Sequence, residues 1–246
     1  MKPPVDNSKF RSIKEMGRVA ATALGQGSWS EARRDLRQAR AHNAILPWHR
    51  ENKFFFIHIP KAAGTSVRTA IGAPFVRKYP HVKANSFYQL DPDLFKSAYS
   101  FAVIRHPLER FLSAYSHIHI MDLHNHDPIL LRAPDVLEWP RFLHRFERSH
   151  WYRSVIFSAL HFQPQWMFVC TPHGQQIVKK LFAFEEMGTI MRHELSTHLG
   201  RKIDLPTNNV STREKDGYVM SDTAKQLILR HYAKDLLLYE KALQGG

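Results

Sequence analysis

The stretch KFFFIHIPKAAGTSVRTAIG, residues 53–72, decides the fold of this chain. Its first part, residues 53–59, is an apolar run rich in Phe and Ile, which predicts a strand buried on both faces, as in a parallel sheet. Its last part, from Gly64 to Ile71, has the pattern of a helix. A strand that ends in a turn of small residues and starts a helix forms an anion-binding corner. The turn points its backbone N–H groups inward, and the helix adds unpaired N–H groups and a positive dipole end.

The side chains of this corner fit a phosphate or a sulfate. Lys61 adds a point charge, Gly64 lets the backbone approach a ligand closely, and the hydroxyls of Thr65 and Ser66 add directional donors. The common nucleotide-binding loop, G-x-x-x-x-G-K-[ST], is not matched, because Lys61 precedes Gly64 and no glycine opens the loop. A magnesium-dependent ATPase or GTPase is therefore disfavoured. The alternative is a Gly-Thr-Ser start of an ordinary helix.

A second corner of the same kind follows in FAVIRHPLERFLSAYSH, residues 101–117. Arg105 ends a second buried strand, expected at 99–105, and a helix begins at Pro107. Ser113 lies eight residues after Arg105, inside that helix, so a guanidinium and a hydroxyl could bind a second phosphate together. Ligands of a parallel sheet lie beyond the carboxyl ends of its strands. We therefore expect both corners to face one cleft and to bind one ligand with two separated anionic groups.

The rest of the chain alternates strand-like and helix-like segments, which predicts an α/β fold with a parallel sheet flanked by helices. We divide it into an N-terminal helical extension, residues 1–50, and one domain, residues 51–246. Residues 72–90 and 206–217 have loop-like sequences. Further strands are expected at 166–170 and 181–185, and further helices at 10–24, 28–42, 135–147, 150–160, 186–199 and 221–243.

The composition of the chain indicates which kinds of partner and which cellular environment to expect. The 246 residues include 35 Lys and Arg against 22 Asp and Glu, a net charge of +13, which favours anionic partners; ordinary solubility charge is the alternative. Cys170 is the single cysteine, so no internal disulfide can form. No run reaches the roughly 18 apolar residues of a membrane span, and no secretory signal is visible. We expect a soluble, cytoplasmic protein.

The two corners together resemble the sulfotransferases. IPKAAGTS is similar to their 5′-phosphosulfate loop, and VIRHPLERFLSAY to the 3′-phosphate motif of the carbohydrate-acting branch that includes heparan 2-O-sulfotransferase. The ending LPTNNVSTREKDGYVMSDTAKQLILRHYAKDLLLYEKAL also resembles that branch, with Tyr232 and Asp235 in its Tyr-x-x-Asp pattern. The resemblance spans most of residues 53–243. Two departures are His106, where Asp or Asn is usual, and Ala62-Ala63 in place of Thr-Gly.

The resemblance implies a P-loop-like sulfotransferase fold, with 3′-phosphoadenosine 5′-phosphosulfate (PAPS) as the sulfuryl donor and no metal. It implies that Lys61 balances charge on the bridging oxygen, and that the N–H groups of Ala62, Ala63, Gly64, Thr65 and Ser66, with the two hydroxyls, hold the 5′-phosphate. Arg105 and Ser113 would hold the 3′-phosphate. Arg213, in the loop before the last helix, would be a third phosphate contact; a solvated loop charge is the alternative.

A base must accept the proton of the acceptor, and His81 is our candidate among 16 histidines, because the resembling branch places a catalytic His between the two motifs. A surface-loop His is the alternative. His58, in a buried strand, is expected to be a core residue. The group at 117–127 (His117, His119, Asp122, His124, His126, Asp127) lacks a tight metal signature, and we expect a loop near the acceptor there, with His117 or His119 touching it.

Three functions follow from these patterns. The first is a PAPS-dependent sulfotransferase that acts on a hydroxyl of a carbohydrate or a small molecule, with an acceptor that the positive charge allows to be anionic. The second is a small-molecule kinase, which would need the nucleotide loop and magnesium ligands that we do not find. The third, a non-enzymatic polyanion binder, would leave the paired corners unexplained. We expect no nucleic-acid partner for the enzyme.

Overall fold

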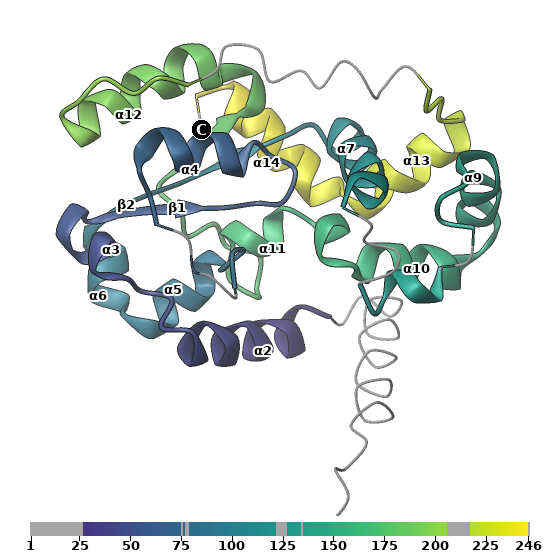
Figure 1. Ribbon diagram of the computed structural model, residues 1–246, viewed down its shortest axis with the longest axis horizontal. Coiled ribbons are helices and arrows are strands. Elements are labelled where there is room, and N and C mark those ends of the chain that lie inside the picture. The colour runs from purple at the N-terminus through teal and green to yellow at the C-terminus, as the bar shows by residue number, and fades with distance from the viewer. Residues whose placement is uncertain are drawn as a thin grey trace, which may run out of the picture.

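The computed structural model describes residues 27–74, 76, 79–121, 127–133, 135–205 and 217–245 (Figure 1). Its sheet has three parallel strands in the order β1-β2-β3, namely β1 (Phe54–Ile57), β2 (Tyr99–Ile104) and β3 (Lys180–Ala183). The expected α/β fold is confirmed. Because neighbouring strands are parallel, the ends of β1 and β2 lie at one edge of the sheet, as the two corners in the sequence predicted.

Both faces of the sheet are buried, because alternate residues of each strand pack into different cores. One face packs against α4 (Gly64–Ile71), a π-helical turn (Met187–Met191) and α12 (Arg192–Leu199). The other packs against α2 (Gly27–Ala41), α5 (Ala84–Leu90), α6 (Pro92–Ser97), α11 (Trp166–Val169) and α14 (Ala233–Leu243). The strand residues on the first face are Phe54, Phe101, Val103 and Phe182, and those on the second are Phe55, Ile57, Ala102, Ile104, Leu181 and Ala183.

A third core holds the helical half of the molecule, beside the sheet (Figure 1). It joins α7 (Pro107–Ile120), α9 (Trp139–Arg148), α10 (His150–Ser158) and α13 (Asp222–His231) through large aromatic side chains such as Phe111, Phe142 and Phe146. The shorter elements are α3 (Pro47–Asn52) and the 3₁₀ turns η1 (Leu130–Arg132), η2 (Leu160–Phe162) and η3 (Phe184–Glu186). None of the helices within the described residues is long and apolar enough to cross a bilayer.

Four expectations about the elements are wrong. The loop expected from residue 117 begins later, because α7 continues to Ile120 and carries His117 and His119. Residues 166–169 form the helix α11 rather than a strand, because the buried carboxylate of Asp235 accepts hydrogen bonds from the N–H groups of Gln165 and Trp166, at 2.7 and 2.9 Å, and so caps that helix. The loop expected at 72–90 contains α5. The single last helix is two helices, which meet at Tyr232. The helix expected at 10–24 lies outside the described residues.

Helix α2 belongs to the core of the sheet half. Ala39 and Ala44 are fully buried there, and α2 runs along α5 (Figure 1). The corner between β1 and α4, the start of α7 and the N-terminal helix are thus parts of one packed body, which sets the positions of the side chains described next.

Candidate active site

The turn between β1 and α4 has the backbone shape of an anion site. Lys61 and Ala63 both have left-handed backbone angles, with φ of 66° and 58°. Ala63 stands at the N-cap of α4, and its methyl group carries no acceptor for the first N–H groups of the helix. The Ala62 N–H donates to the Ile59 carbonyl at 3.3 Å, and the turn after it has the backbone shape and helix start that favour an anion. Thr65 is exposed and Ser66 is half-buried at the start of the helix.

The structure gives a reason for a glycine at position 64 that the sequence did not show. A Cβ atom at this position would lie 1.7 Å from Cδ2 and 1.9 Å from Nε2 of the His58 imidazole. The glycine therefore makes room for the His58 ring, which lies against the turn from inside. His58 was expected to be a core residue in a strand, but it lies just after β1 and is half-buried. Burial lowers its pKa to about 3, and the nearby His81 and Arg68 lower it further.

Arg105 at the end of β2 lies against the same turn. Its Nη1 donates to the Lys61 carbonyl at 3.4 Å, and its Nη2 lies 3.9 Å from the Glu109 carboxylate. The guanidinium carbon lies 4.5 Å from the centre of the Phe184 ring. The backbone of Arg105 is held on both sides by the Gln165 amide, which accepts from its N–H at 3.0 Å and donates to its carbonyl at 2.7 Å. The structure thus brings the two predicted corners together.

Arg110 is the residue that ties these segments to the helical half, and the sequence analysis assigned it no role. It is buried in α7, where its Nε donates to the Pro60 carbonyl at 3.0 Å and its Nη2 donates to the carbonyls of His161 and Gln163 at 3.1 and 2.8 Å. Burial raises the pKa of Asp235 to about 6, against the opposing field of Arg110. The signal in the sequence was a charge inside the otherwise apolar face of α7.

His81 lies beside His58 in the segment between α4 and α5. Its Nδ1 is 3.1 Å from the His58 carbonyl oxygen, and their ring centroids are 4.4 Å apart. A carbonyl can only accept, so Nδ1 carries the proton and Nε2 keeps a free lone pair. Burial lowers the pKa of His81 below 6.5; the carbonyl contact opposes this shift and Arg110 reinforces it. His81 is therefore neutral at pH 7, the state that a general base requires.

Two more histidines extend this group, and one of them was not foreseen. The ring of His161, in η2, lies 6.1 Å from that of His81, and the ring of His117, on α7, lies 4.9 Å from that of His161. Burial lowers the pKa of His161 to about 3 and that of His117 to about 4, and Lys61 lowers both further. Lys61 therefore lies close enough to these two rings for its charge to act on them. No motif in the sequence marks His161.

The remaining expected residues are placed as follows. Ser113 is half-buried on α7, three residues after Arg110 and four before His117, so the three share one helix face. His119 is exposed near the end of α7. Arg213 and residues 122–126 lie outside the described residues. Among the residues that the structure describes, no three His, Cys, Asp or Glu side chains form a group that could hold a metal ion.

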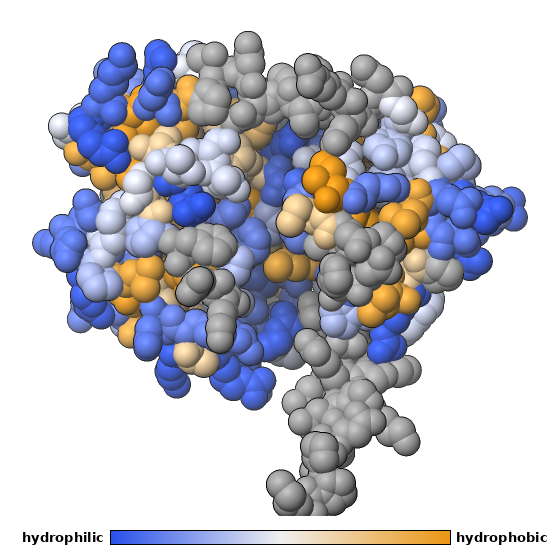
Figure 2. Space-filling view, viewed as in Figure 1, coloured by the Kyte–Doolittle hydropathy of each residue, from blue (hydrophilic) through white to orange (hydrophobic). Residues whose placement is uncertain are grey.

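The surface of the molecule is hollowed in the region between α4 and α7, where the sheet half meets the helical half (Figures 1 and 2). Figure 2 shows hydrophilic residues deep in this hollow. An anion-binding turn, a second cation, a neutral imidazole with a free Nε2 and further imidazoles thus converge where the two halves meet. This arrangement can hold an anionic donor and accept a proton from a hydroxyl group.

Comparison with known proteins agrees with this chemistry. A model of a family described as the sulfotransferase family matches residues 48–242, which include the β1–α4 turn, His81, Arg105 and α7. No curated protein and no solved structure matched the chain.

Proposed function

The chain belongs to the sulfotransferase family, and from that premise we propose that it transfers a sulfuryl group from PAPS to a hydroxyl group of a carbohydrate, with His81 as the base. Membership of the family supports an enzyme that transfers a sulfuryl group to a hydroxyl acceptor. The observation that carries the rest is the junction of the two strand ends, where the Arg105 guanidinium lies 3.4 Å from the Lys61 carbonyl. Two cations on one junction suit a donor with two separated phosphate groups.

The chemistry of the residues fits this donor. The N–H groups from Ala62 to Ser66, with the two hydroxyls of that segment, would hold the 5′-phosphate. Arg105 and Ser113 would hold the 3′-phosphate, which distinguishes PAPS from ATP. A guanidinium suits this task because its planar fork can donate two hydrogen bonds to one phosphate. Arg213 remains a proposed further contact.

The transfer step then needs only positioning and charge balance. The acceptor hydroxyl gives its proton to Nε2 of His81 as its oxygen bonds to sulfur, and the bond from sulfur to the bridging oxygen of the 5′-phosphate breaks. The electron pair of that bond stays on the bridging oxygen, where the Lys61 ammonium offsets the new charge. Sulfuryl transfer resembles phosphoryl transfer in that positioning and electrostatic stabilisation carry it.

The acceptor class rests on two further arguments. The motif VIRHPLERFLSAY is similar to that of the carbohydrate-acting branch that includes heparan 2-O-sulfotransferase, and we propose that this chain belongs to that branch. The net charge of +13 suits an acceptor that is itself anionic, such as an acidic glycan.

Radiolabelled donor offered with a panel of neutral glycans, acidic glycans and small alcohols tests the proposal. We expect label to enter a glycan. We also expect 3′,5′-bisphosphoadenosine to raise the melting temperature, since a ligand at 100 times its Kd adds about 2.7 kcal/mol. ATP with magnesium should raise it less. If ATP with magnesium stabilises the protein more, the donor assignment is wrong and a kinase is favoured. If only alcohols are labelled, the carbohydrate acceptor is wrong.

A further inference from the structure

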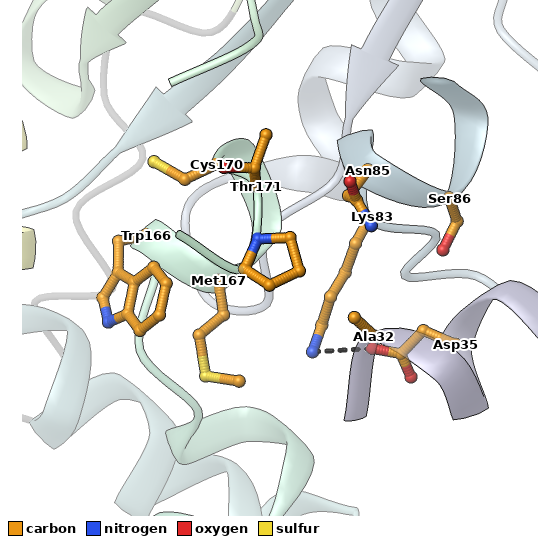
Figure 3. A pocket seen from close by; sticks show the side chains of 10 residues that line it. Ala32, Asp35, Lys83, Asn85, Ser86, Trp166, Met167, Cys170 and Thr171 are labelled. Carbon is orange, nitrogen blue, oxygen red and sulfur yellow. Dashed lines mark ion pairs between the residues drawn. The ribbon is translucent and has the colours of Figure 1, made fainter. Parts of the chain in front are cut away.

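The segment that carries His81 is held at its Lys83 end by a carboxylate of helix α2, and its Tyr79 end lies beside the same carboxylate. The Lys83 ammonium lies 2.8 Å from Oδ2 of Asp35. Burial raises the pKa of the Tyr79 hydroxyl and the nearby Asp35 carboxylate raises it further. Tyr79 and Lys83 stand two residues before and two residues after His81. Figure 3 shows Lys83 and Asp35 meeting at one side of a pocket, with Trp166 and Met167 on the other side.

This anchor is buried, so its geometry is fixed. Lys83 and Asp35 are each only 5% exposed. The ammonium also donates to Oε1 of Gln163 at 3.1 Å and lies 5.1 Å from the centre of the Phe168 ring. Burial by itself would raise the pKa of Asp35, but Lys83, Arg34 and Tyr79 together hold it below its ordinary value. A buried ion pair is costly to break, because either partner alone would be left as an uncompensated charge.

The same network reaches the donor turn. Nε2 of Gln163 lies 3.4 Å from the Glu31 carboxylate, a second acidic group of α2, and the Gln163 carbonyl accepts from Arg110 at 2.8 Å. Nε of Arg110 in turn donates to the carbonyl of Pro60, the residue before Lys61. Helix α2 is therefore connected through hydrogen bonds both to the segment of the base and to the turn proposed to hold the donor.

The segment itself has little regular structure to hold it. Residues 79–83 lie in neither a helix nor a strand. Their contacts to the site include the hydrogen bond from His81 Nδ1 to the His58 carbonyl. In an irregular segment no backbone ladder fixes the position of a side chain, so the Lys83–Asp35 ion pair and the side-chain contacts of the segment decide where the imidazole lies. A displacement of about 1 Å at such a base can cost a hundredfold in rate.

We propose that Asp35 is a positioning residue, which holds the Tyr79–Lys83 segment so that His81 faces the acceptor, and that helix α2 is therefore part of the catalytic unit. This inference rests on the proposed role of His81 as the base. It assigns a function to residues that precede the span matched by the sulfotransferase family model, residues 48–242.

A matched pair of variants tests the proposal. Tyr79→Phe and Tyr99→Phe each remove one hydroxyl that acts on a carboxylate and keep the ring: the Tyr79 hydroxyl lies near Asp35, and the Tyr99 hydroxyl donates to Glu194 at 2.5 Å. We expect Tyr79→Phe to lower kcat several-fold while KM for PAPS and the shift in melting temperature with 3′,5′-bisphosphoadenosine stay within about twofold. Tyr99→Phe should change none of these values.

A second variant separates positioning from stability. Asp35→Asn alone leaves the Lys83 charge buried without its partner and is expected to destabilise the fold. The double variant Asp35→Asn/Lys83→Met removes both charges and keeps a long apolar stem over Phe168. We expect the double variant to recover most of the melting temperature that Asp35→Asn loses. Its kcat should still be lower than that of the wild type by about tenfold or more.

The titration of His81, followed by NMR through its ring Cε1–H signal and assigned with His81→Gln, gives a readout that needs no activity. The charged and titratable groups that face His81 are His58 after β1, Arg110 and His117 on α7, and His161 in η2. A loosened segment exposes the imidazole to water, so its pKa should rise toward 6.5 in Tyr79→Phe and in the double variant.

The outcomes separate the two claims. If kcat and the His81 titration are unchanged in both variants, Asp35 is a packing residue only and the proposal is wrong. If the titration of His81 moves in the variants but the wild-type protein transfers no sulfuryl group, the positioning role of Asp35 is supported and the proposed function is wrong. If the wild type is active and the titration is unchanged, the proposed function is supported and the positioning role is wrong.

Discussion

Gly64→Ala probes the contact between the donor turn and the His58 ring. The new Cβ would lie 1.7 Å from Cδ2 and 2.6 Å from Cγ of that ring, whereas ordinary contacts begin at 3.4 Å. A shift of a few tenths of an ångström cannot relieve such an overlap, so the buried ring must leave its place. Overpacking of this kind costs about 1–3 kcal/mol. Alanine is a better helix former than glycine by at most about 1 kcal/mol. The net prediction is a loss of about 1–2 kcal/mol in the free energy of unfolding.

Urea denaturation of four proteins measures this: the wild type, Gly64→Ala, His58→Ala and the double variant. Once the His58 ring is absent, the three atoms nearest to the new Cβ are gone, and the alanine should stabilise the protein by about 0.5–1 kcal/mol. The effect of Gly64→Ala should therefore change sign between the two backgrounds. Such a reversal is a coupling well above the 0.3–0.5 kcal/mol within which independent sites add.

Additive free energies would refute the reasoning. If Gly64→Ala costs the same with and without the His58 ring, the ring is not the reason for the glycine. Binding of 3′,5′-bisphosphoadenosine by the double variant gives a second check. If the double variant regains stability but does not bind 3′,5′-bisphosphoadenosine, a glycine at position 64 is needed so that a phosphate can approach the backbone, as the sequence indicated.

Three further predictions concern the base, the buried arginine and the response to acid. His81→Gln should lower kcat by about 10²–10⁴ while 3′,5′-bisphosphoadenosine still raises the melting temperature, and loss of both would show that His81 is structural. Arg110→Met leaves the carbonyls of Pro60, His161 and Gln163 without their donor, so the free energy of unfolding in urea should fall by about 3–5 kcal/mol; a loss under about 1 kcal/mol would contradict the role we assign. Burial lowers the pKa of His231 to about 4, so between pH 6.5 and 4 the unfolded chain binds more protons at this ring than the folded chain, and stability falls as the pH is lowered. His231→Phe should therefore make the urea stability less steep in pH by up to about 1.4 kcal/mol per pH unit in this window, and an unchanged slope would contradict that pKa.

Local sequence was enough for the first corner of the fold. The apolar run of β1, the small-residue turn and α4 follow one another directly, and each has its own periodicity. The second corner repeats the pattern at Arg105 and Pro107, so the parallel pairing of β1 and β2 could also be expected. Each strand–turn–helix corner is formed by residues that are close in the chain, and propensity describes such units well.

The errors arose where distant residues decide the local structure. The apolar run WMFVC fits a strand by composition, but Asp235, about 70 residues later, caps it as the helix α11. A short apolar run cannot be assigned by periodicity alone. Tyr232 and Asp235, which the sequence marked only by resemblance, both have structural roles. Asp235 caps α11, and the Tyr232 hydroxyl donates to the Phe162 carbonyl at 2.5 Å in the core.

The sequence indicated the charged residues and the base of the candidate site, but not the residues that hold them in place. Lys61, Arg105 and His81 stand in recognisable patterns, and their roles in binding and catalysis remain predictions. His161 has no pattern of its own, because it enters the site only when η2 folds against α7. Nothing in the sequence marked the role of Asp35 either, because its contacts are with Lys83 and Tyr79, which follow it in the chain by more than 40 residues.

The central claim is that one ligand with two anionic groups spans the ends of β1 and β2. Calorimetric titration of the wild type and of Arg105→Ala with 3′,5′-bisphosphoadenosine and with 5′-AMP tests it most directly, because the two ligands differ by the 3′-phosphate alone. We predict that the wild type binds the bisphosphate tighter than 5′-AMP by about tenfold or more, and that Arg105→Ala removes most of this difference while its affinity for 5′-AMP is kept. An Arg105→Ala protein that still prefers the bisphosphate by the same factor would contradict the claim.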